Sequence, residues 1–162
     1  MISKDDEDTD DVRSGERSKD GPGDARILIA DDDPDMCELL GTFLANLGYQ
    51  VCEAFSGTEL LRVIRATEID AFPMDGVDLV IMDNRMPGFT GVEILQKLRA
   101  CHWDTPLILM TAFPDAWVRA QTHKLDATLL AKPFSLEALK KTVHEALSER
   151  TGAPSAHVRN LS

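Results

Sequence analysis

The stretch that decides the fold is Asp78-Leu79-Val80-Ile81-Met82-Asp83, continued by Asn84-Arg85-Met86-Pro87-Gly88-Phe89-Thr90-Gly91. The apolar run inside it has the length and branched side chains of a strand that is buried on both faces, and the Met-Pro-Gly that follows predicts a turn. Asp83 therefore stands at the carboxyl end of a buried strand. Ligands of open parallel α/β sheets bind at this edge, so Asp83 is the first candidate functional residue.

Three further predicted strands also end in polar side chains. The strand over residues 27–30 runs into Asp31, Asp32 and Asp33, that over 106–110 ends in Thr111, and that over 127–131 runs into Lys132. Asp33 precedes Pro34 and is a good helix N-cap, worth about 1 kcal/mol. Capping does not explain Asp31 and Asp32, whose like charges repel unless a cation lies between them.

Helical periodicity separates the strands, the remaining strand being predicted over 50–54. The helices are expected over residues 34–47, 57–66, 91–100, from 114 through 121, and from 135 to about 151. Five alternating units imply an α/β fold, a (βα)5 doubly wound five-stranded parallel sheet of order 2-1-3-4-5, flavodoxin-like. Strands one and three are then neighbours, so Asp31, Asp32 and Asp83 should share one crevice, with Thr111 and Lys132 on its other side.

Composition limits the classes of function. The 162 residues suit one domain, predicted over 26–149, between a disordered acidic tail (1–25) and a short flexible tail (150–162). The net charge of −11 should repel nucleic acid and anionic membrane. Three cysteines without metal-ligand spacing fit a reducing compartment, and no apolar run approaches membrane-spanning length. A soluble cytoplasmic protein is expected.

The carboxylates predict the chemistry of the crevice. Three carboxylates require a hard cation, and Mg²⁺ suits them because it keeps waters that phosphate oxygens can replace. With Mg²⁺ bound, Asp83 can attack a phosphoryl group and become an aspartyl phosphate. Thr111 can then donate a hydrogen bond to one product oxygen and Lys132 can pair with another, so both should be drawn in only after the transfer. Such a site is a switch.

The chain at this point resembles the receiver domain of the two-component response regulators. The resemblance covers about residues 26–149 and rests on four segments: Ile27 to Pro34, Asp78 to Gly91 with its Asp83-x-x-Met86-Pro87-Gly88, Thr111-Ala112, and Lys132-Pro133-Phe134. It implies that Asp83 accepts phosphate from a phosphohistidine of a sensor histidine kinase or a phosphotransfer protein. It further implies that Asp31, Asp32 and Asp83 hold Mg²⁺, with Asp32 as a direct ligand and the backbone carbonyl of Arg85 as another.

The chain departs from the family pattern at several positions. Leu129 replaces the Tyr or Phe that the family usually has three residues before the lysine, so the signal is expected to travel through the fourth helix or its loop. Leu125-Asp126 replaces the usual Gly-Ala, and the connection over 67–77 is longer than usual, with Phe72 and Met74 as packing residues or a lid. Arg85 and Phe113 occupy positions that tune hydrolysis in this family. Bulky Phe113 is predicted to slow hydrolysis by shielding the acyl phosphate.

Two alternatives remain. Asp31-x-Asp33 after an apolar strand also resembles the haloacid-dehalogenase phosphatases, with Asp31 as nucleophile and Asp33 as acid, but the Asp83 loop would then be unexplained. A degenerate receiver that binds partners without phosphate is suggested by Leu129, whereas the presence of Asp83, Thr111 and Lys132 argues against it. The 150–162 segment is too short for an output domain, so a stand-alone receiver is expected. It would be no enzyme beyond its own phosphorylation and dephosphorylation, and its output would be a protein contact.

The remaining candidates are interpreted as structural. Trp103 and Trp117 are expected to be half-buried packing residues rather than interface anchors. The cysteines, Cys37, Cys52 and Cys101, are expected to be small buried side chains. The histidines lack paired ligand spacing and are expected on the surface: His102, His123, His144 and His157.

Overall fold

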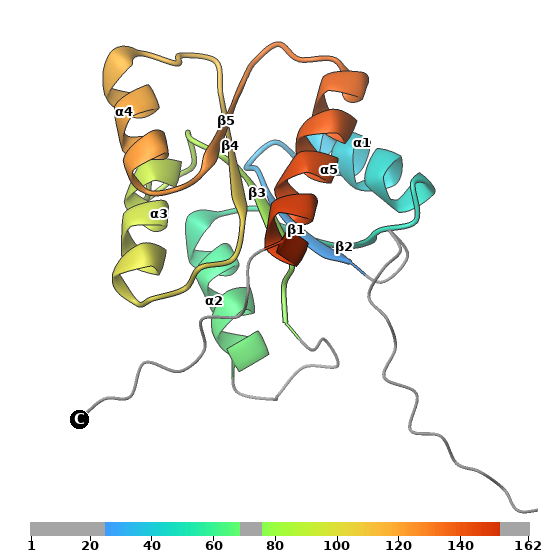
Figure 1. The fold of residues 1–162 in the computed structure, drawn as a ribbon, viewed down its shortest axis with the longest axis horizontal. Coiled ribbons are helices and arrows are strands. Elements are labelled where there is room, and N and C mark those ends of the chain that lie inside the picture. The colour runs from blue at the N-terminus through green and yellow to red at the C-terminus, as the bar shows by residue number, and fades with distance from the viewer. Residues whose placement is uncertain (1–24, 69–75, 153–162) are drawn as a thin grey trace, which may run out of the picture.

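The computed structural model describes residues 25–68 and 76–152. A sheet of five parallel strands runs through them in the order β2-β1-β3-β4-β5 (Figure 1). The strands are β1 (Arg26–Ala30), β2 (Gln50–Ala54), β3 (Leu79–Asp83), β4 (Leu107–Thr111) and β5 (Thr128–Ala131). The predicted (βα)5 fold with strand order 2-1-3-4-5 is confirmed.

The central strands are apolar because both of their faces are covered. Every residue of β3 and β4 is buried, and side chains alternate between two separate hydrophobic clusters on the two sides of the sheet. Val80 and Met82 belong to one cluster, whereas Leu79 and Ile81 belong to the other. The edge strands β2 and β5 are only partly buried. A continuous apolar run, rather than an alternating one, is the pattern that such central strands require.

The helices are α1 (Pro34–Asn46), α2 (Gly57–Glu68), α3 (Gly91–Ala100), α4 (Ala116–Lys124) and α5 (Leu136–Gly152). Buried side chains of α1 and α5 pack in the cluster with Ile81, and those of α2, α3 and α4 pack in the cluster with Met82. The helices therefore lie on both faces of the sheet, as Figure 1 shows. No helix in the two described ranges is long and apolar enough to span a bilayer.

Short polar side chains cap four of the helices. Asp33 caps α1 by accepting from the Asp35 N–H, Thr90 forms a capping box with Glu93 at α3, and Asp115 caps α4. The predicted cap Asp33 is confirmed, and at the start of α5 Ser135 Oγ accepts the Ala138 N–H at 3.0 Å. The helix expected from Pro114 begins two residues later, at Ala116.

Several surface assignments from sequence are wrong. Leu39, an apolar residue within the helix expected over 34–47, is 52% exposed, and Trp117, expected to be half-buried, is 57% exposed. Of the three cysteines expected to be buried, Cys101 is exposed and Cys52 only partly buried. Periodicity identifies the inner face of a helix, but it does not show where no neighbouring element covers that face. Trp103 packs partly buried against the core, as expected.

Other expectations concern the segments between and beyond the described ranges. Helix α2 continues to Glu68, two residues into the connection expected to be irregular, and α5 continues to Gly152. Phe72, Met74, His157 and the 1–24 part of the predicted tail lie outside the described residues. His102, His123 and His144 are exposed, as expected.

Candidate functional site

Three carboxylates meet at the carboxyl edge of the sheet. Asp31 and Asp32 follow β1, Asp83 is the last residue of β3, and one oxygen from each lies within 4.8 Å of the others. Asp31 is 1% exposed and Asp83 9% exposed, whereas Asp32 faces solvent. Strands β1 and β3 are hydrogen-bonded neighbours, which brings these residues together. The structure thus places the predicted carboxylates in one crevice.

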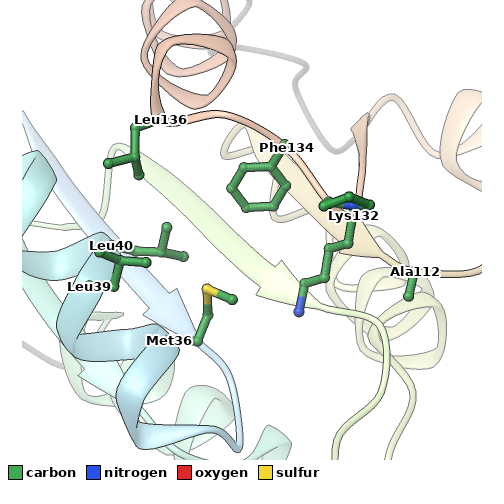
Figure 2. A pocket seen from close by; sticks show the side chains of 8 residues that line it. Met36, Leu39, Leu40, Ala112, Lys132, Phe134 and Leu136 are labelled. Atoms are coloured by element: carbon green, nitrogen blue, oxygen red, sulfur yellow. The ribbon is translucent and has the colours of Figure 1, made fainter.

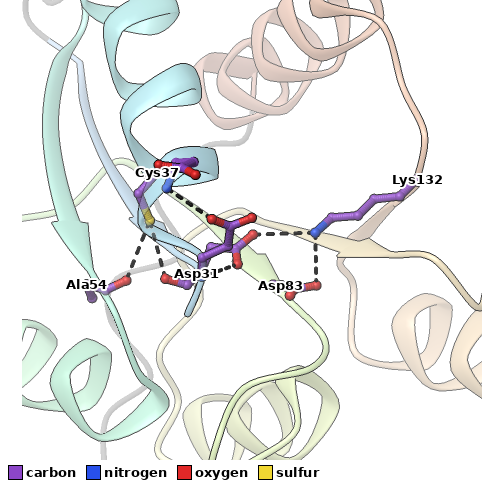
Figure 3. Close-up of polar contacts among 7 residues, drawn as sticks. Asp31, Cys37, Ala54, Asp83 and Lys132 are labelled. Atoms are coloured by element: carbon purple, nitrogen blue, oxygen red, sulfur yellow. Dashed lines mark hydrogen bonds and ion pairs between the residues drawn. The ribbon is translucent and has the colours of Figure 1, made fainter.

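The turn after β1 fixes Asp31 in place. Its backbone N–H donates to Ala54 O at 3.1 Å, and its Oδ1 accepts the Asp33 N–H at 3.0 Å. The buried thiol of Cys37, on the first turn of α1, donates to the backbone oxygen of Asp31 at 3.3 Å (Figure 3). Burial raises the pKa of this thiol to about 11, so Cys37 stays protonated and acts as a donor. The carboxylate is therefore pre-oriented toward Asp83 and Lys132.

Lys132 reaches the same crevice from the end of β5. Its Nζ lies 3.4 Å from Asp31 Oδ2 and 3.4 Å from Asp83 Oδ1, and the side chain is 21% exposed (Figure 3). Its backbone N–H donates to Thr111 O at 2.7 Å, which ties β5 to β4 at this point. The expectation that Lys132 enters only after phosphoryl transfer is wrong. The two carboxylates carry two negative charges, and the nearby ammonium group offsets one of them.

The surroundings of Asp31 act on the pKa of its carboxyl group in opposite directions. Desolvation raises the pKa of Asp31, and the neighbouring Asp83 carboxylate raises it further, whereas the Asp33 N–H and Lys132 act in the opposite direction. A divalent cation would relieve both unfavourable contributions, because it replaces lost hydration with direct charge contact. Oxygen-only donors with one exposed member, Asp32, suit Mg²⁺, which keeps several of its waters. The residues present therefore fit this ion.

Thr111 ends β4 beside Asp83. It is 3% exposed, and its Oγ1 accepts the Phe113 N–H at 3.1 Å, which leaves the hydroxyl proton free to be donated elsewhere. In the sheet, Asp83 is registered with Met110, the residue before Thr111. The predicted hydroxyl is thus on the strand next to the proposed phosphoacceptor.

Asn84 braces the loop after Asp83, a role that sequence reasoning missed. Its N–H donates to Met110 O at 2.8 Å, its carbonyl accepts the Gly91 N–H at 2.8 Å, and its Oδ1 accepts the Val92 N–H at 3.2 Å. A Cβ on Gly91 would lie 2.9 Å from Asp83 O and 2.5 Å from Leu109 Cδ1, so only glycine fits there. A turn-forming Asn directly after Asp83 was the available signal.

The loop bearing Arg85 is closed by an isolated bridge between Arg85 and Thr90. Gly88, between them, has φ +86°, a conformation that glycine adopts without cost. The exposed Arg85 side chain lies over the ring of Phe113, with Cζ 4.4 Å from the ring centroid. The carbonyl role of Arg85 stays a prediction.

Arg99 is a second residue that sequence reasoning missed. From the last turn of α3 its guanidinium donates to four backbone oxygens, those of Trp103, Thr105, Leu125 and Asp126, at 2.7–3.0 Å. The bonds hold the turn before β5, where Asp126 has φ +52° in place of the glycine the family uses nearby. No local sequence pattern marks this role, because all four acceptors are main-chain oxygens and two of them, those of Leu125 and Asp126, lie 26 and 27 residues away.

An apolar pocket adjoins the site on the α1 side. It has a volume of about 390 Å³ and is lined by Met36, Leu39, Leu40, Ala112, Lys132, Pro133, Phe134 and Leu136. Figure 2 shows Met36, Leu40 and Phe134 around this space, with the amino group of Lys132 at its edge. Lys132 therefore lines the pocket and also contacts the carboxylates.

The sequence model of the response regulator receiver domain matches residues 27–144. The chain belongs to the response regulator receiver family. The match spans all five strands and α1 to α4, and it includes each of the carboxylates, Thr111 and Lys132. The receiver family excludes the haloacid-dehalogenase alternative, and Asp33, its required acid, is engaged in capping α1.

Relatives of this receiver differ in length. It is 35% identical to the transcriptional regulatory protein GlrR of Escherichia coli over 132 residues, which is 80% of this chain but only 28% of GlrR. It is 29% identical to the sporulation initiation phosphotransferase F of Bacillus subtilis, covering 75% of this chain and 93% of that protein. This chain therefore spans less than a third of the length of the transcriptional regulatory proteins GlrR, QseF and ZraR.

Solved receiver structures share the fold. The response regulator receiver domain protein of Clostridium thermocellum superposes with a TM-score of 0.68 at 27% identity, covering 78% of this chain and 97% of that one. TrrA of Thermotoga maritima, solved in complex with Mg²⁺ and BeF, superposes with a TM-score of 0.62 at 32% identity, covering 76% and 99%.

Proposed function

We propose that this receiver is a phosphoacceptor that takes a phosphoryl group onto Asp83, in the presence of Mg²⁺, from a phosphohistidine of a sensor histidine kinase or a phosphotransfer protein. The observation that carries the proposal is the convergence of Asp31, Asp32 and Asp83 with Lys132 at one edge of the sheet. A structural ion pair would not need three carboxylates for one lysine. The surplus negative charge calls for a divalent cation.

In this proposal each side chain at the sheet edge has its own task. Asp31, Asp32 and Asp83 would hold Mg²⁺, with the Arg85 carbonyl, and the ion would supply charge neutralisation at the phosphoryl oxygens. A free oxygen of Asp83 attacks phosphorus as the phosphorus–nitrogen bond breaks and the donor imidazole leaves with the bonding electrons. Lys132 then moves its ammonium group from the carboxylates to a phosphoryl oxygen, and Thr111 donates its free hydroxyl proton to another.

The chain acts on itself in this proposal. It catalyses its own phosphorylation and, with water in place of the donor imidazole, its own dephosphorylation, and it turns over no other substrate. The result is a change in protein contacts. Free cysteines and a kinase as donor support action in the cytoplasm.

The apolar pocket supports a protein donor. It opens between α1 and the start of α5, and Lys132 connects it with the carboxylates, so an apolar side chain seated there would hold a donor histidine near Asp83. Leu39→Asp should lower the rate of phosphorylation by a protein donor by roughly tenfold, about the effect of losing 1.4 kcal/mol of apolar contact. Ala45→Asp, which adds the same charge at another exposed position of α1, should have no effect.

Small phosphodonors test the proposal without a partner. Acetyl phosphate with Mg²⁺ should label the protein, hydroxylamine should release the label, and Asp83→Asn should abolish it. Asp104→Asn, at an exposed acid away from the crevice, is the matched control and should be labelled as the original chain is. Labelling that persists in Asp83→Asn would reject the proposal.

A phosphate-independent binding module is the second candidate, and Leu129 is the observation that favours it. Its aliphatic side chain packs against the core and cannot make the aromatic movement expected of this position. An Asp83→Ala protein that keeps all partner binding and output would establish this alternative.

A further inference from the structure

Arg85 and Phe113 form a contact across the mouth of the site. Each lies two residues beyond the end of its strand, Arg85 after Asp83 of β3 and Phe113 after Thr111 of β4. The Arg85 Cζ is 4.4 Å from the centroid of the Phe113 ring, and the ring is 60% exposed. Because β3 and β4 are hydrogen-bonded neighbours, this contact joins the two loops that flank Asp83.

Two residues near Asp83 hold Phe113: Thr111 contacts its main chain and Arg85 contacts its side chain. Its N–H donates to Thr111 Oγ1 at 3.1 Å, while its ring lies under the Arg85 guanidinium. Any group on Asp83 that attracted the Thr111 hydroxyl or the Arg85 cation would therefore act on Phe113. Leu129 offers no such coupling, because it is an aliphatic side chain packed in the core.

We propose that the Arg85 guanidinium, beyond the backbone carbonyl of this residue, is a ligand of the phosphoryl group on Asp83, and that binding it releases the Phe113 ring. The inference rests on the proposed function. The π face of an exposed Phe holds a cation only weakly, whereas a phosphoryl group offers two negative charges in a geometry that a guanidinium binds bidentately. The Arg85 guanidinium therefore leaves the Phe113 ring and pairs with the phosphoryl group.

The contact thus works as a latch with two positions. Before phosphoryl transfer, the Arg85 guanidinium holds the Phe113 ring against the loop that follows β3. After transfer, Arg85 pairs with the phosphoryl oxygens, and the freed ring can lie over the acyl phosphate, where it would exclude water. Phosphorylation is then reported by Phe113 and the loop leading into α4, instead of by the residue at position 129.

Fluorine NMR of the full chain labelled with 4-fluorophenylalanine tests the latch. Beryllofluoride with Mg²⁺ serves as the probe for the phosphoryl group, and the Phe113 resonance is identified by its loss in Phe113→Leu. We expect this resonance to move on adding beryllofluoride. In Arg85→Gln it should start displaced from its original position and move little, and beryllofluoride should bind several-fold more weakly. Arg85→Lys, which keeps the charge but not the fork, should be intermediate.

A matched control uses the other cation–ring contact of the described residues, Lys97 Nζ at 5.5 Å from the Phe89 ring. Lys97→Gln should leave the Phe113 resonance and its displacement unchanged. The latch would be wrong, and the proposed function untouched, if beryllofluoride bound without moving the Phe113 resonance. The same holds if it moved this resonance as far in Arg85→Gln as in the original chain. Failure of beryllofluoride to bind would overturn the proposed function, and the latch with it.

Discussion

Lys132 places its ammonium nitrogen 3.4 Å from Oδ1 of Asp83. Asp83 is the last residue of β3 and Lys132 follows β5, so the lysine side chain reaches across the end of β4, which lies between them. The bond from Lys132 N–H to Thr111 O fixes the start of the side chain that spans this gap. Lys132 thereby offsets one of the two negative charges that Asp31 and Asp83 carry. The ammonium group and Mg²⁺ consequently compete for the same charges.

Removing the lysine should therefore strengthen metal binding while weakening phosphorylation. We expect Lys132→Met to bind Mg²⁺ several-fold more tightly in isothermal titration calorimetry, because the ammonium group that lies 3.4 Å from both carboxylates no longer competes with the ion for them. Its phosphorylation by acetyl phosphate should fall roughly 100-fold, the usual order for loss of one charge-stabilising donor. Lys141→Met, whose exposed side chain pairs with Glu145, should change neither quantity. Unchanged or weaker Mg²⁺ binding by Lys132→Met would contradict the competition.

Asp31 should make the metal-free protein less stable as the pH rises. Burial raises the folded-state pKa of Asp31 above its ordinary value of 3.8, so the folded protein keeps this proton at a pH at which the unfolded chain has lost it. Stability contributed by the protonated form is present below that ordinary value and declines as pH rises through the raised pKa. Urea unfolding in EDTA should show Asp31→Asn to be more stable than the original chain near neutral pH, with the difference vanishing in acid. A lower stability of Asp31→Asn at neutral pH would contradict the effect of burial.

Phe113 should lengthen the life of the phosphorylated state. We expect Phe113→Ala to shorten the lifetime of the acyl phosphate several-fold, because the large ring next to the site limits the approach of water. The measurement is loss of label after removal of free acetyl phosphate. Trp117→Ala removes a comparably exposed ring from α4 and should leave the lifetime unchanged. Equal lifetimes for Phe113→Ala and the original chain would show that the ring does not shield Asp83.

Arg99 should contribute to stability through its main-chain bonds. Arg99→Ala leaves four carbonyl groups without their charged donor, and we expect the free energy of unfolding to fall by about 2–3 kcal/mol. Arg62→Ala, at an exposed position of α2, should change it by less than about 0.5 kcal/mol. Denaturant titrations of both variants provide the comparison. A loss at Arg99 no larger than that at Arg62 would mean that water replaces the guanidinium without cost.

The sequence was most informative where burial is complete. The runs that became β3 and β4 are apolar throughout because both sheet faces are covered, and their polar last residues, Asp83 and Thr111, stood out for that reason. The handedness of the crossovers then predicted a parallel sheet covered on both faces, and the order 2-1-3-4-5 of flavodoxin-like sheets placed Asp31 next to Asp83 without any contact being known.

The side-chain contacts and exposures that the sequence did not predict depend on distances in the folded protein. Lys132 was expected to wait for the phosphoryl group, yet it already bridges two carboxylates, because its reach across β4 is a matter of three-dimensional spacing. Leu39 and Trp117 fit helical periodicity but lie where no other described element covers them. Arg99 bonds to the oxygens of Leu125 and Asp126, 26 and 27 residues further along the chain, and the Arg85–Phe113 contact joins the loops after β3 and β4.

Mapping the phosphorylated residue tests the central claim most directly. The full chain is incubated with acetyl phosphate and Mg²⁺, the acyl phosphate is trapped by borohydride reduction, and the modified peptide is identified by mass spectrometry. We expect reduction at Asp83 alone, and none when EDTA replaces Mg²⁺. Modification of Asp31 or Asp33, or labelling that is independent of the metal, would contradict the assignment of Asp83 as the phosphoacceptor.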